Sequence, residues 1–170
     1  VGKAISQGLL SLEDRLADFF PESLPDKAPE ALYEIRLKHL LTMSSGFGKP
    51  YLMGDDRRAG TGMPDYMAYM LSRPVKNEPG STFVYSTADS ILAGRMVEKA
   101  TGKNLSVYLY EEILRPIGLE YPIWEMDPAG HPIGGGGMFL TLTDMMRLGQ
   151  LYLAEGMWEG KRILEPSWVR

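Results

Sequence analysis

The sequence of 170 residues predicts a mainly α fold in one domain, with long loops and one short hairpin. Three observations carry this prediction. Apolar residues recur at helical spacing in several segments, and a capping residue precedes most of these segments. Glycine or proline ends them. The short Val- and Ile-rich runs that a parallel sheet would place between helices are absent.

The first half of the chain is expected to form short helices separated by loops. Ser11 with Asp14 three residues later is typical of a helix N-terminus. Proline marks residues 23–34, and glycine with polar residues marks residues 48–62, so we expect exposed loops in both segments. The helices predicted here share an apolar face and cover residues 1–10, 11–20, 35–41 and 63–73.

The second half contains the longest predicted helix, over residues 88–100, with Thr87 as its N-cap and Gly102 as its stop. Asn104 is expected to cap the next helix, which ends at Pro116. Thr141 or Thr143 can cap a further helix, and the Pro-Ser pair at 166–167 begins another. The expected apolar face of the helix after Thr143 consists of Met145, Leu148, Gly149, Tyr152 and Leu153. A tight turn is predicted at Glu159-Gly160 between two short extended pieces.

Composition excludes several classes of function. The formal net charge is −4 at pH 7, and Lys and Arg form no basic stripe, so nucleic acid and anionic membranes are not expected partners. The chain contains no cysteine, which rules out disulfides, thiol catalysis and thiolate metal sites. No apolar run reaches the roughly 18 residues of a membrane-spanning helix.

Other candidate sites have simpler interpretations. His39 and His131 are the only histidines, and neither has a second ligand at helical spacing, so no metal site is predicted. We expect His39 to be structural and His131 to lie in a turn. The glycine run at 134–137 lacks the lysine of a phosphate-binding loop, which favours a backbone that passes close to a neighbour or takes a positive φ angle. Ser44-Ser45 is interpreted as a polar turn after a helix. Five methionines on or near amphipathic faces are interpreted as core residues, namely Met63, Met67, Met70, Met145 and Met146.

Tyr85 leaves two alternatives open. It follows a Pro-Gly turn and precedes the long helix within the stretch FVYSTADS. It can be an aromatic packing residue with a satisfied hydroxyl. It can also be a catalytic phenol, although a free phenol with a pKa of about 10 is a poor base unless a cation lies beside it.

Three segments in fixed order resemble one family and cover nearly the whole chain. They read HLLTMSSGF, EPGSTFVYSTADSILAGRMVEKATGKNLSVYLYEEILRPIGL and GGGGMFLTLTDMMRLGQLYLAEGMWEGKRILEPSW. The chain resembles the serine β-lactamase-like superfamily of class C β-lactamases, D-Ala-D-Ala peptidases, esterases and amide hydrolases. Within it, the sequence is most similar to the esterase and 6-aminohexanoate-oligomer hydrolase branch. The resemblance implies the helical lobe of the β-lactamase/transpeptidase-like α+β fold, with residues 1–170 as a single partial domain.

The resemblance also implies a mechanism and a set of site residues. In the family, a serine of a Ser-x-x-Lys motif forms an acyl-enzyme, and a Tyr-x-Asn tyrosine shares the role of base. Tyr85 occupies that tyrosine position, while Thr87 replaces the asparagine that reaches the substrate, which weakens the case for β-lactam hydrolysis. Small-molecule esters, amides or β-lactams are the implied substrates, and no metal or organic cofactor is implied. The residues expected to line the substrate pocket are Ser86, Thr87, Gly136, Gly137 and Met138.

No serine of this chain has lysine three residues later, and the chain contains no Lys-Thr-Gly. We therefore expect a fragment of a serine hydrolase that is inactive alone and that exposes apolar helix faces through which it can associate. The alternative is a catalytically dead homologue that acts as a binding or sensor module, which Thr87 favours. A third interpretation is a helical interaction domain with chance similarity.

Overall fold

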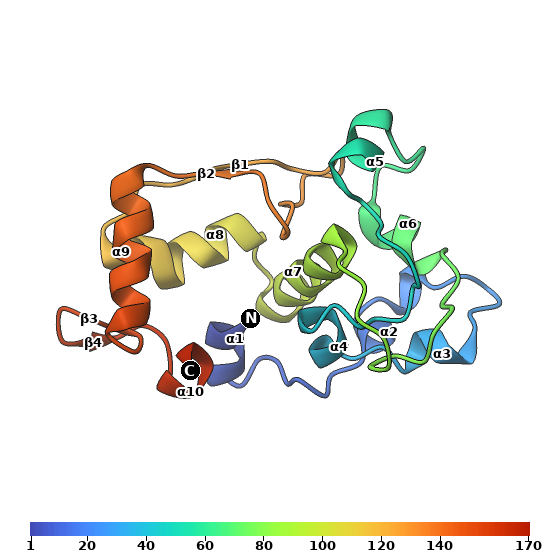
Figure 1. Cartoon of the computed structure of the whole chain (residues 1–170), viewed down its shortest axis with the longest axis horizontal. Coiled ribbons are helices and arrows are strands. Elements are labelled where there is room, and N and C mark those ends of the chain that lie inside the picture. The colour runs from blue at the N-terminus through green and yellow to red at the C-terminus, as the bar shows by residue number, and fades with distance from the viewer.

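The computed structural model describes all 170 residues and contains ten α-helices, of which α7 (Thr87–Thr101) is the longest (Figure 1). The only sheets are two antiparallel hairpins of two strands each. The mainly α prediction is therefore confirmed, with two hairpins where one was expected. None of the helices has the length and apolar character needed to span a lipid bilayer.

The larger hydrophobic core lies between α7 and the helices that precede it. Ile91, Leu92 and Met96 recur at helical spacing, so one face of α7 points toward these helices, and all three side chains are buried. Leu37 and Leu40 of α4 and Met67 and Met70 of α6 are among the residues that pack against them in this core of 23 buried residues. The preceding helices are α1 (Gly2–Ser6), α2 (Leu16–Phe19), α3 (Glu30–Tyr33), α4 (Leu37–Leu41), α5 (Gly54–Ala59) and α6 (Tyr66–Leu71), with a 3-10 turn at Pro21–Ser23.

A second, much smaller core holds the remainder of the chain together. It contains six buried residues, among them Leu114 and Ile117 after α8, Leu151 of α9, and Ile163. Such a small apolar cluster contributes less to stability than the main core. The elements here are α8 (Leu105–Leu109) with the turns Tyr110–Leu114 and Arg115–Ile117, β1 (Ile123–Trp124), β2 (Met138–Phe139), α9 (Leu142–Leu153), β3 (Met157–Trp158), β4 (Lys161–Arg162) and α10 (Pro166–Val169).

The two hairpins have definite registers. Ile123 lies opposite Phe139, and Trp124 lies opposite Met138. In the second hairpin Trp158 lies opposite Lys161. The two residues between them, Glu159 and Gly160, have φ angles of 44° and 78°, as a tight hairpin turn requires. The turn predicted at Glu159-Gly160 is confirmed.

The helix expected from Ser11 begins later, at Leu16. Ser11 and Asp14 do interact, because the Ser11 N–H donates to the Asp14 carboxylate at 2.8 Å, but they close only a turn. Arg15 then pairs with Arg36 in an isolated β-bridge. This extended backbone at Arg15 delays the helix, so a local capping signal was overridden by a contact with a distant segment.

Two predicted loops contain short helices instead. α3 lies within residues 23–34, and α5 lies within residues 48–62. In α5 the Asp56 side chain accepts the Met53 N–H at 3.2 Å. Acidic residues occupy the first turn of α5 and basic residues the last, which suits the helix dipole. This charge order is a helix signal that glycine content obscured.

Helix ends follow the expected signals with one correction. Ser86 is the N-cap of α7, and Thr87 is its first residue, because the Ser86 backbone is still extended. Gly102 ends α7 in the left-handed conformation, as predicted. Asn104 caps α8, and Thr141, rather than Thr143, caps α9 in a reciprocal box with Asp144.

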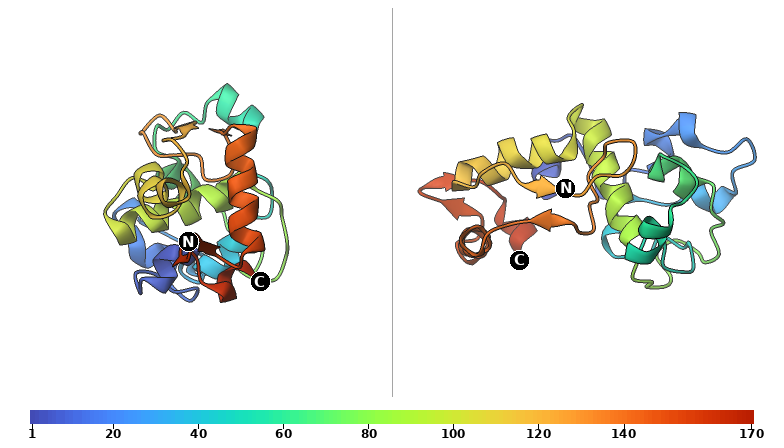
Figure 2. Two further views of the ribbon diagram at one scale, coloured as in Figure 1. Left: turned by 90° about the vertical axis from the view of Figure 1, so that its left-hand side faces the viewer. Right: turned by 90° about the horizontal axis from the view of Figure 1, so that it is seen from above.

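Helix α9 stands apart from α7 at one end of the molecule (Figure 1). The view from above in Figure 2 shows the same separation, with the first hairpin running between the two helices. The chain ends lie side by side, since the ring of Trp168 packs on the backbone of Gly2. The Lys3 ammonium donates to the Ile163 carbonyl at 3.2 Å, which further ties α1 to the C-terminal segment.

Candidate active site at the start of helix α7

Tyr85 lies at the entrance to α7 and is 57% exposed. Its hydroxyl makes no hydrogen bond within the chain, although the next two residues, Ser86 and Thr87, are buried. The neighbouring Phe83 is also exposed. A buried packing tyrosine with a satisfied hydroxyl, the simpler of the two alternatives, does not describe this side chain.

Ser86 anchors the start of the helix to a distant loop. The Tyr51 N–H donates to the Ser86 hydroxyl at 3.1 Å, and that hydroxyl donates to the Tyr51 carbonyl at 3.3 Å. The Ala88 N–H donates to the same carbonyl. The Ser86 side chain is therefore occupied by the backbone of Tyr51, which fixes the residue that follows Tyr85.

Thr87 faces the glycine run, which approaches α7 closely. The Thr87 hydroxyl lies 3.3 Å from the Met53 sulfur. A Cβ atom on Gly135 would lie only 2.8 Å from the Thr87 methyl group, and one on Gly134 would collide with the Ser90 carbonyl. The prediction that glycine lets this backbone pass close to a neighbour is confirmed.

The glycine run continues into strand β2. Gly136 is exposed, Gly137 has a φ angle of 74°, and Met138 is half-buried. The Trp124 indole N–H lies 2.9 Å from both the Ile133 and the Gly136 carbonyls, which holds the loop against β1. The structure thus brings Thr87 beside Gly135. Gly136, Gly137 and Met138 are the next residues along the chain and lead away from that contact into β2.

Residues 43–46 form the other side of the site, as a turn after α4. Met43 has a φ angle of 51°, which is strained for a side chain of this kind, and its carbonyl accepts the Val84 N–H at 2.9 Å. The Ser44 carbonyl accepts the Gly80 N–H at 2.8 Å. The polar turn predicted at Ser44-Ser45 is confirmed, and it attaches the loop that carries Tyr85.

Asp89 is a residue of this site that the sequence interpretation missed. It is 1% exposed, and the Ser45 hydroxyl donates to its Oδ1 at 2.8 Å. Burial raises the pKa of this carboxyl to about 6, and the hydrogen bonds from Ser45 only partly oppose that shift. A signal was available, because Asp89 lies on the same helical row as Ala93 and Met96 and is the one acidic residue on that apolar face.

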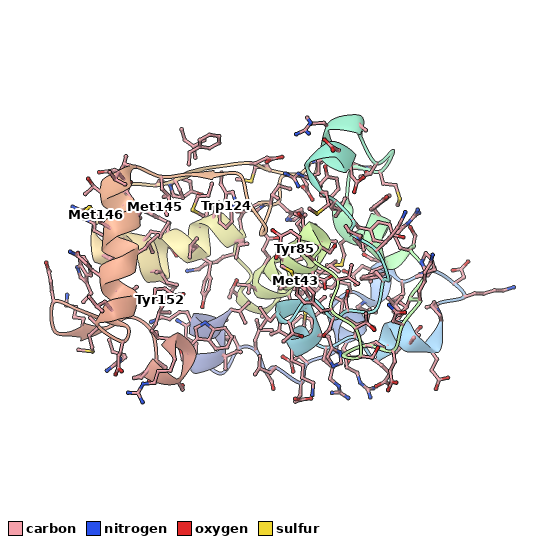
Figure 3. All side chains as sticks on the ribbon, viewed as in Figure 1. Met43, Tyr85, Trp124, Met145, Met146 and Tyr152 are labelled. Carbon is pink, nitrogen blue, oxygen red and sulfur yellow. The ribbon has the colours of Figure 1, made fainter.

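Large apolar side chains are exposed beside Tyr85 and also on the first hairpin and α9, away from it. Figure 3 labels Tyr85 with Met43 beside α7 and α4, Trp124 on the hairpin, and Met145, Met146 and Tyr152 on α9. Most of the face predicted for α9 is exposed: Leu148 is its only half-buried residue, and the buried residue of the helix is Leu151, which was not predicted. Met145 and Met146 are exposed, so the prediction that they are core residues is wrong. The large apolar side chains exposed on these segments are Phe83 near Tyr85, Ile123 and Phe139 on the hairpin, and Leu142, Met145, Met146, Tyr152 and Leu153 on α9.

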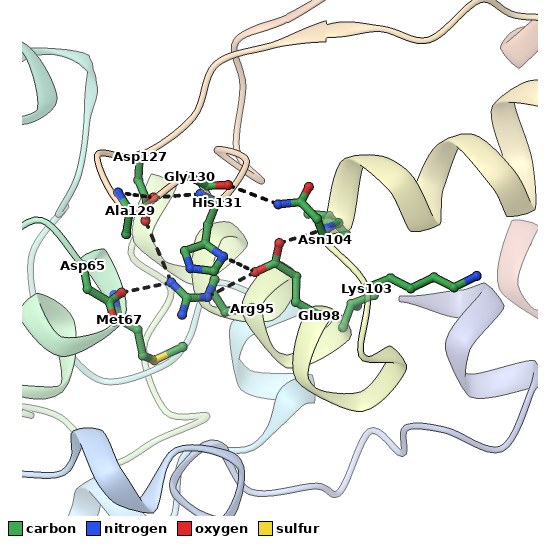
Figure 4. Close-up of polar contacts among 12 residues, drawn as sticks. Asp65, Met67, Arg95, Glu98, Lys103, Asn104, Asp127, Ala129, Gly130 and His131 are labelled. Carbon is green, nitrogen blue, oxygen red and sulfur yellow. Dashed lines mark hydrogen bonds and ion pairs between the residues drawn. The ribbon is translucent and has the colours of Figure 1, made fainter.

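A separate polar cluster holds the far end of α7 (Figure 4). Glu98 accepts from Arg95 at 3.2 Å and from the Leu105 N–H at 2.8 Å, and it pairs with His131 Nδ1 at 2.6 Å. The His131 N–H donates to Asp127, which places this histidine in a turn as predicted. The cluster ties the segment before the glycine run to α7.

The remaining donors support no metal centre. No group of three or more His, Asp or Glu side chains could hold a metal ion. His39 is structural, as expected, because its Nδ1 accepts the Arg36 N–H at 3.2 Å. Burial, followed by Lys38 and Arg36, lowers the pKa of His39, so the neutral ring can accept this bond at neutral pH.

Comparison with known proteins identifies the relatives of this chain. The family model described as Beta-lactamase matches residues 1–169. The protein named "Putative D-alanyl-D-alanine carboxypeptidase" of Escherichia coli (strain K12) is 30% identical over 128 residues, which cover 72% of this chain and 30% of that protein. Esterase EstB of Burkholderia gladioli is 30% identical over 201 residues, which cover 85% of this chain and 51% of the esterase.

Solved structures agree on the fold. The structure described as "Putative 6-aminohexanoate-dimer hydrolase from Bacillus anthracis" superposes with a TM-score of 0.81 at 21% identity. The match covers 99% of this chain and 47% of that one. The chain therefore spans about half, or less, of the length of these relatives.

Proposed function

Because the chain belongs to the β-lactamase family, we propose that it supplies the helical lobe and the general base of a serine hydrolase. The enzyme would cleave a small ester or amide through an acyl-enzyme. The relatives carry names of a carboxypeptidase and an esterase, which supports an ester or amide as the class of substrate. The chain also spans only part of each relative, which supports a longer protein as the active form.

The exposure of Tyr85 is the observation that carries this proposal. A tyrosine whose hydroxyl is free, at the start of a rigid helix, is available to exchange a proton with a nucleophile. The backbone on both sides of Tyr85 is held by hydrogen bonds, from Val84 to Met43 and from Tyr51 to Ser86. The point from which the phenol side chain extends is therefore fixed. The glycine loop packs against Thr87 at Gly135, and the space beside the next residue, Gly136, is open.

The proposed reaction has two halves. A serine hydroxyl attacks the substrate carbonyl carbon, and its proton passes to the Tyr85 phenolate, which a lysine ammonium stabilises. The tetrahedral oxyanion collapses, the C–O or C–N bond breaks, and Tyr85 returns the proton to the departing alcohol or amine. Water then attacks the acyl-serine with the same proton transfers and releases the acid. The chain contains no Ser-x-x-Lys motif, so we propose that these residues alone have no turnover.

The test compares the full-length gene product with the 170-residue chain on p-nitrophenyl butyrate and on a p-nitroanilide. We expect turnover only in the full-length protein, with kcat reduced by roughly 10²–10⁴-fold in Tyr85→Phe. Tyr33→Phe is the matched control, because Tyr33 is also partly exposed but lies in α3. Unchanged kcat in Tyr85→Phe, or turnover by the chain alone, would overturn the proposal.

A second candidate is a catalytically dead homologue that binds the same class of molecule. The state of Thr87 favours it, because the side chain is buried and its hydroxyl contacts Met53 rather than open space. A full-length protein that binds an ester or a β-lactam without turnover, and that resists labelling by a fluorophosphonate, would decide for this candidate. Labelling followed by slow hydrolysis would decide against it.

A further inference from the structure

A buried carboxyl lies beneath the first turn of α7. Asp89 occupies the third helical position, four residues after Tyr85, and only its Oδ1 has a hydrogen-bond partner. Its Oδ2 is buried and makes no hydrogen bond. An unsatisfied buried carboxyl oxygen is costly, so a simple packing role would be served better by an apolar residue.

The partner of Asp89 belongs to the turn that carries the Tyr85 loop. Three carbonyls of residues 43–46 accept backbone N–H groups from residues 76–84, namely those of Met43, Ser44 and Gly46. Gly46 has a φ angle of 93°, and a Cβ atom there would collide with the Asn77 carbonyl. This turn therefore has a specialised backbone shape, and the loop before Tyr85 takes its position from it.

One side-chain hydrogen bond connects that turn to α7, and it joins Ser45 to Asp89. We propose that Asp89 is a positioning residue for Tyr85, because it locks the turn at residues 43–46 to the helix that follows the tyrosine. Val84 is hydrogen-bonded to the turn, and Ser86 is the N-cap of the helix, so Tyr85 is the one residue between the turn-bound loop and the helix. If the turn moves relative to the helix, the Tyr85 phenol changes position, because Tyr85 lies between the two.

The surroundings of Asp89 agree with this role. Burial and the hydrogen bonds from Ser45 set its pKa, and no charged side chain from α4, α7 or the 76–84 loop contributes to it. The carboxyl therefore has no ion-pair partner, and Ser45 is the one residue that hydrogen-bonds to it. The inference rests on the proposed function, since Tyr85 needs a fixed position only if its phenol acts in the reaction.

The test reads Tyr85 directly in the 170-residue chain, labelled with ¹³C at the tyrosine Cζ. Loss of one resonance in Tyr85→Phe assigns the signal. We expect Ser45→Ala and Asp89→Ala to shift and broaden that resonance, because each removes the link between turn and helix. Asp89→Asn should restore it, since the asparagine oxygen can still accept from Ser45.

Asp144→Ala is the matched control, because Asp144 also occupies the third position of its helix, α9. Its carboxylate accepts the Thr141 N–H and makes no hydrogen bond with Tyr85. The proposal is overturned if Ser45→Ala shifts the Tyr85 resonance no more than Asp144→Ala does. A failure of Asp89→Asn to restore the signal overturns it as well. If Asp89→Ala does not fold, the milder Ser45→Ala decides.

The resonance requires no catalysis, so the two proposals fail separately. If Tyr85 responds to Ser45→Ala while Tyr85→Phe leaves full-length turnover unchanged, the positioning holds and the assigned role of Tyr85 is wrong. If Tyr85→Phe abolishes turnover while Ser45→Ala leaves the Tyr85 resonance unchanged, Tyr85 is catalytic and Asp89 does not position it.

Discussion

Two residues beside the start of α7 hold conformations or charges that cost stability. Met43 has a positive φ angle, and Asp89 keeps a carboxyl in an apolar surrounding. Both contact the loop or the helix that flanks Tyr85. Such local costs are frequent at functional sites, where the geometry of a reactive group outweighs the stability of the fold.

The raised pKa of Asp89 makes stability depend on pH in a defined direction. A carboxyl whose pKa is about 6 when folded, against about 4 when unfolded, stabilises the fold fully below pH 4 and loses this contribution as pH rises through 6. Relative to Asp89→Asn, the wild-type free energy of unfolding should fall by on the order of 2 kcal/mol between pH 4 and pH 7.5. Urea unfolding at both pH values measures this difference.

Asp144→Asn provides the control for that experiment. The hydrogen bond from the Thr141 hydroxyl lowers the pKa of Asp144, followed by the bond from the Thr141 backbone. Its contribution is therefore present above its unfolded pKa and is lost as pH falls, so the sign is opposite to that of Asp89. Equal pH dependence in wild type and Asp89→Asn would show that Asp89 is not the titrating group.

The glycine run permits a matched pair of substitutions. Gly134→Ala should lower the free energy of unfolding by about 1–3 kcal/mol, because the new Cβ meets the Ser90 carbonyl and forces the loop away from α7. Gly136→Ala should be nearly neutral, since nothing lies within 4 Å of its Cβ position. Thermal unfolding of the two variants compares them. A neutral Gly134→Ala would mean that the close approach is not required.

At the scale of elements, helix α7 connects the two halves of the site. Its first turn carries the Ser86 and Asp89 contacts, while its last turns carry Arg95 and Glu98. Glu98 is 10% exposed and joins α7 to α8 through Leu105 and to the loop before the glycine run through His131. Helix α7 thus fixes the position of both Tyr85 and the loop that leads into the glycine run.

Glu98→Ala should destabilise the protein by about 2 kcal/mol, because it leaves Arg95 and His131 without their shared carboxylate. Faster amide hydrogen exchange is expected in residues 127–134. Glu111→Ala removes an exposed ion pair with Lys103 and should leave the melting temperature near that of the wild type. Equal exchange rates in both variants would contradict the role given to Glu98.

At the scale of the whole molecule, α9 and the first hairpin present an apolar face that nothing in the chain covers. Leu142 and Leu153 are 81% and 87% exposed at opposite ends of α9. A contiguous exposed apolar surface of this kind is typical of an interface. We propose that the rest of the longer protein covers it, as the partial coverage of the relatives suggests.

The isolated chain should therefore bind a hydrophobic dye and associate at micromolar concentration. Leu142→Glu with Leu153→Glu should reduce both effects without loss of stability, because neither side chain packs inside the chain. Gln150→Glu adds charge on the same helix without removing apolar surface and is the control. Dye fluorescence and sedimentation velocity measure the result, and a monomer without dye binding would contradict the fragment interpretation.

Helix periodicity and end signals determined most of the element order from the sequence alone. The row of Leu92, Met96 and neighbouring residues predicted α7, and Gly102 and Asn104 predicted its end and the next start, because helix propensity and capping act within a few residues. Motif order likewise determined the family, and it selected Tyr85 as the residue to examine.

Tertiary contacts alone decided the rest. The Arg15–Arg36 bridge shortened the helix expected at Ser11. Most of the α9 face that was expected to be buried is exposed. The Ser45–Asp89 bond joins residues 44 positions apart, so no local pattern could reveal it. Capping and periodicity are local interactions that a sequence displays directly, whereas burial, raised pKa values and the exposure of Tyr85 depend on which distant segments exclude water.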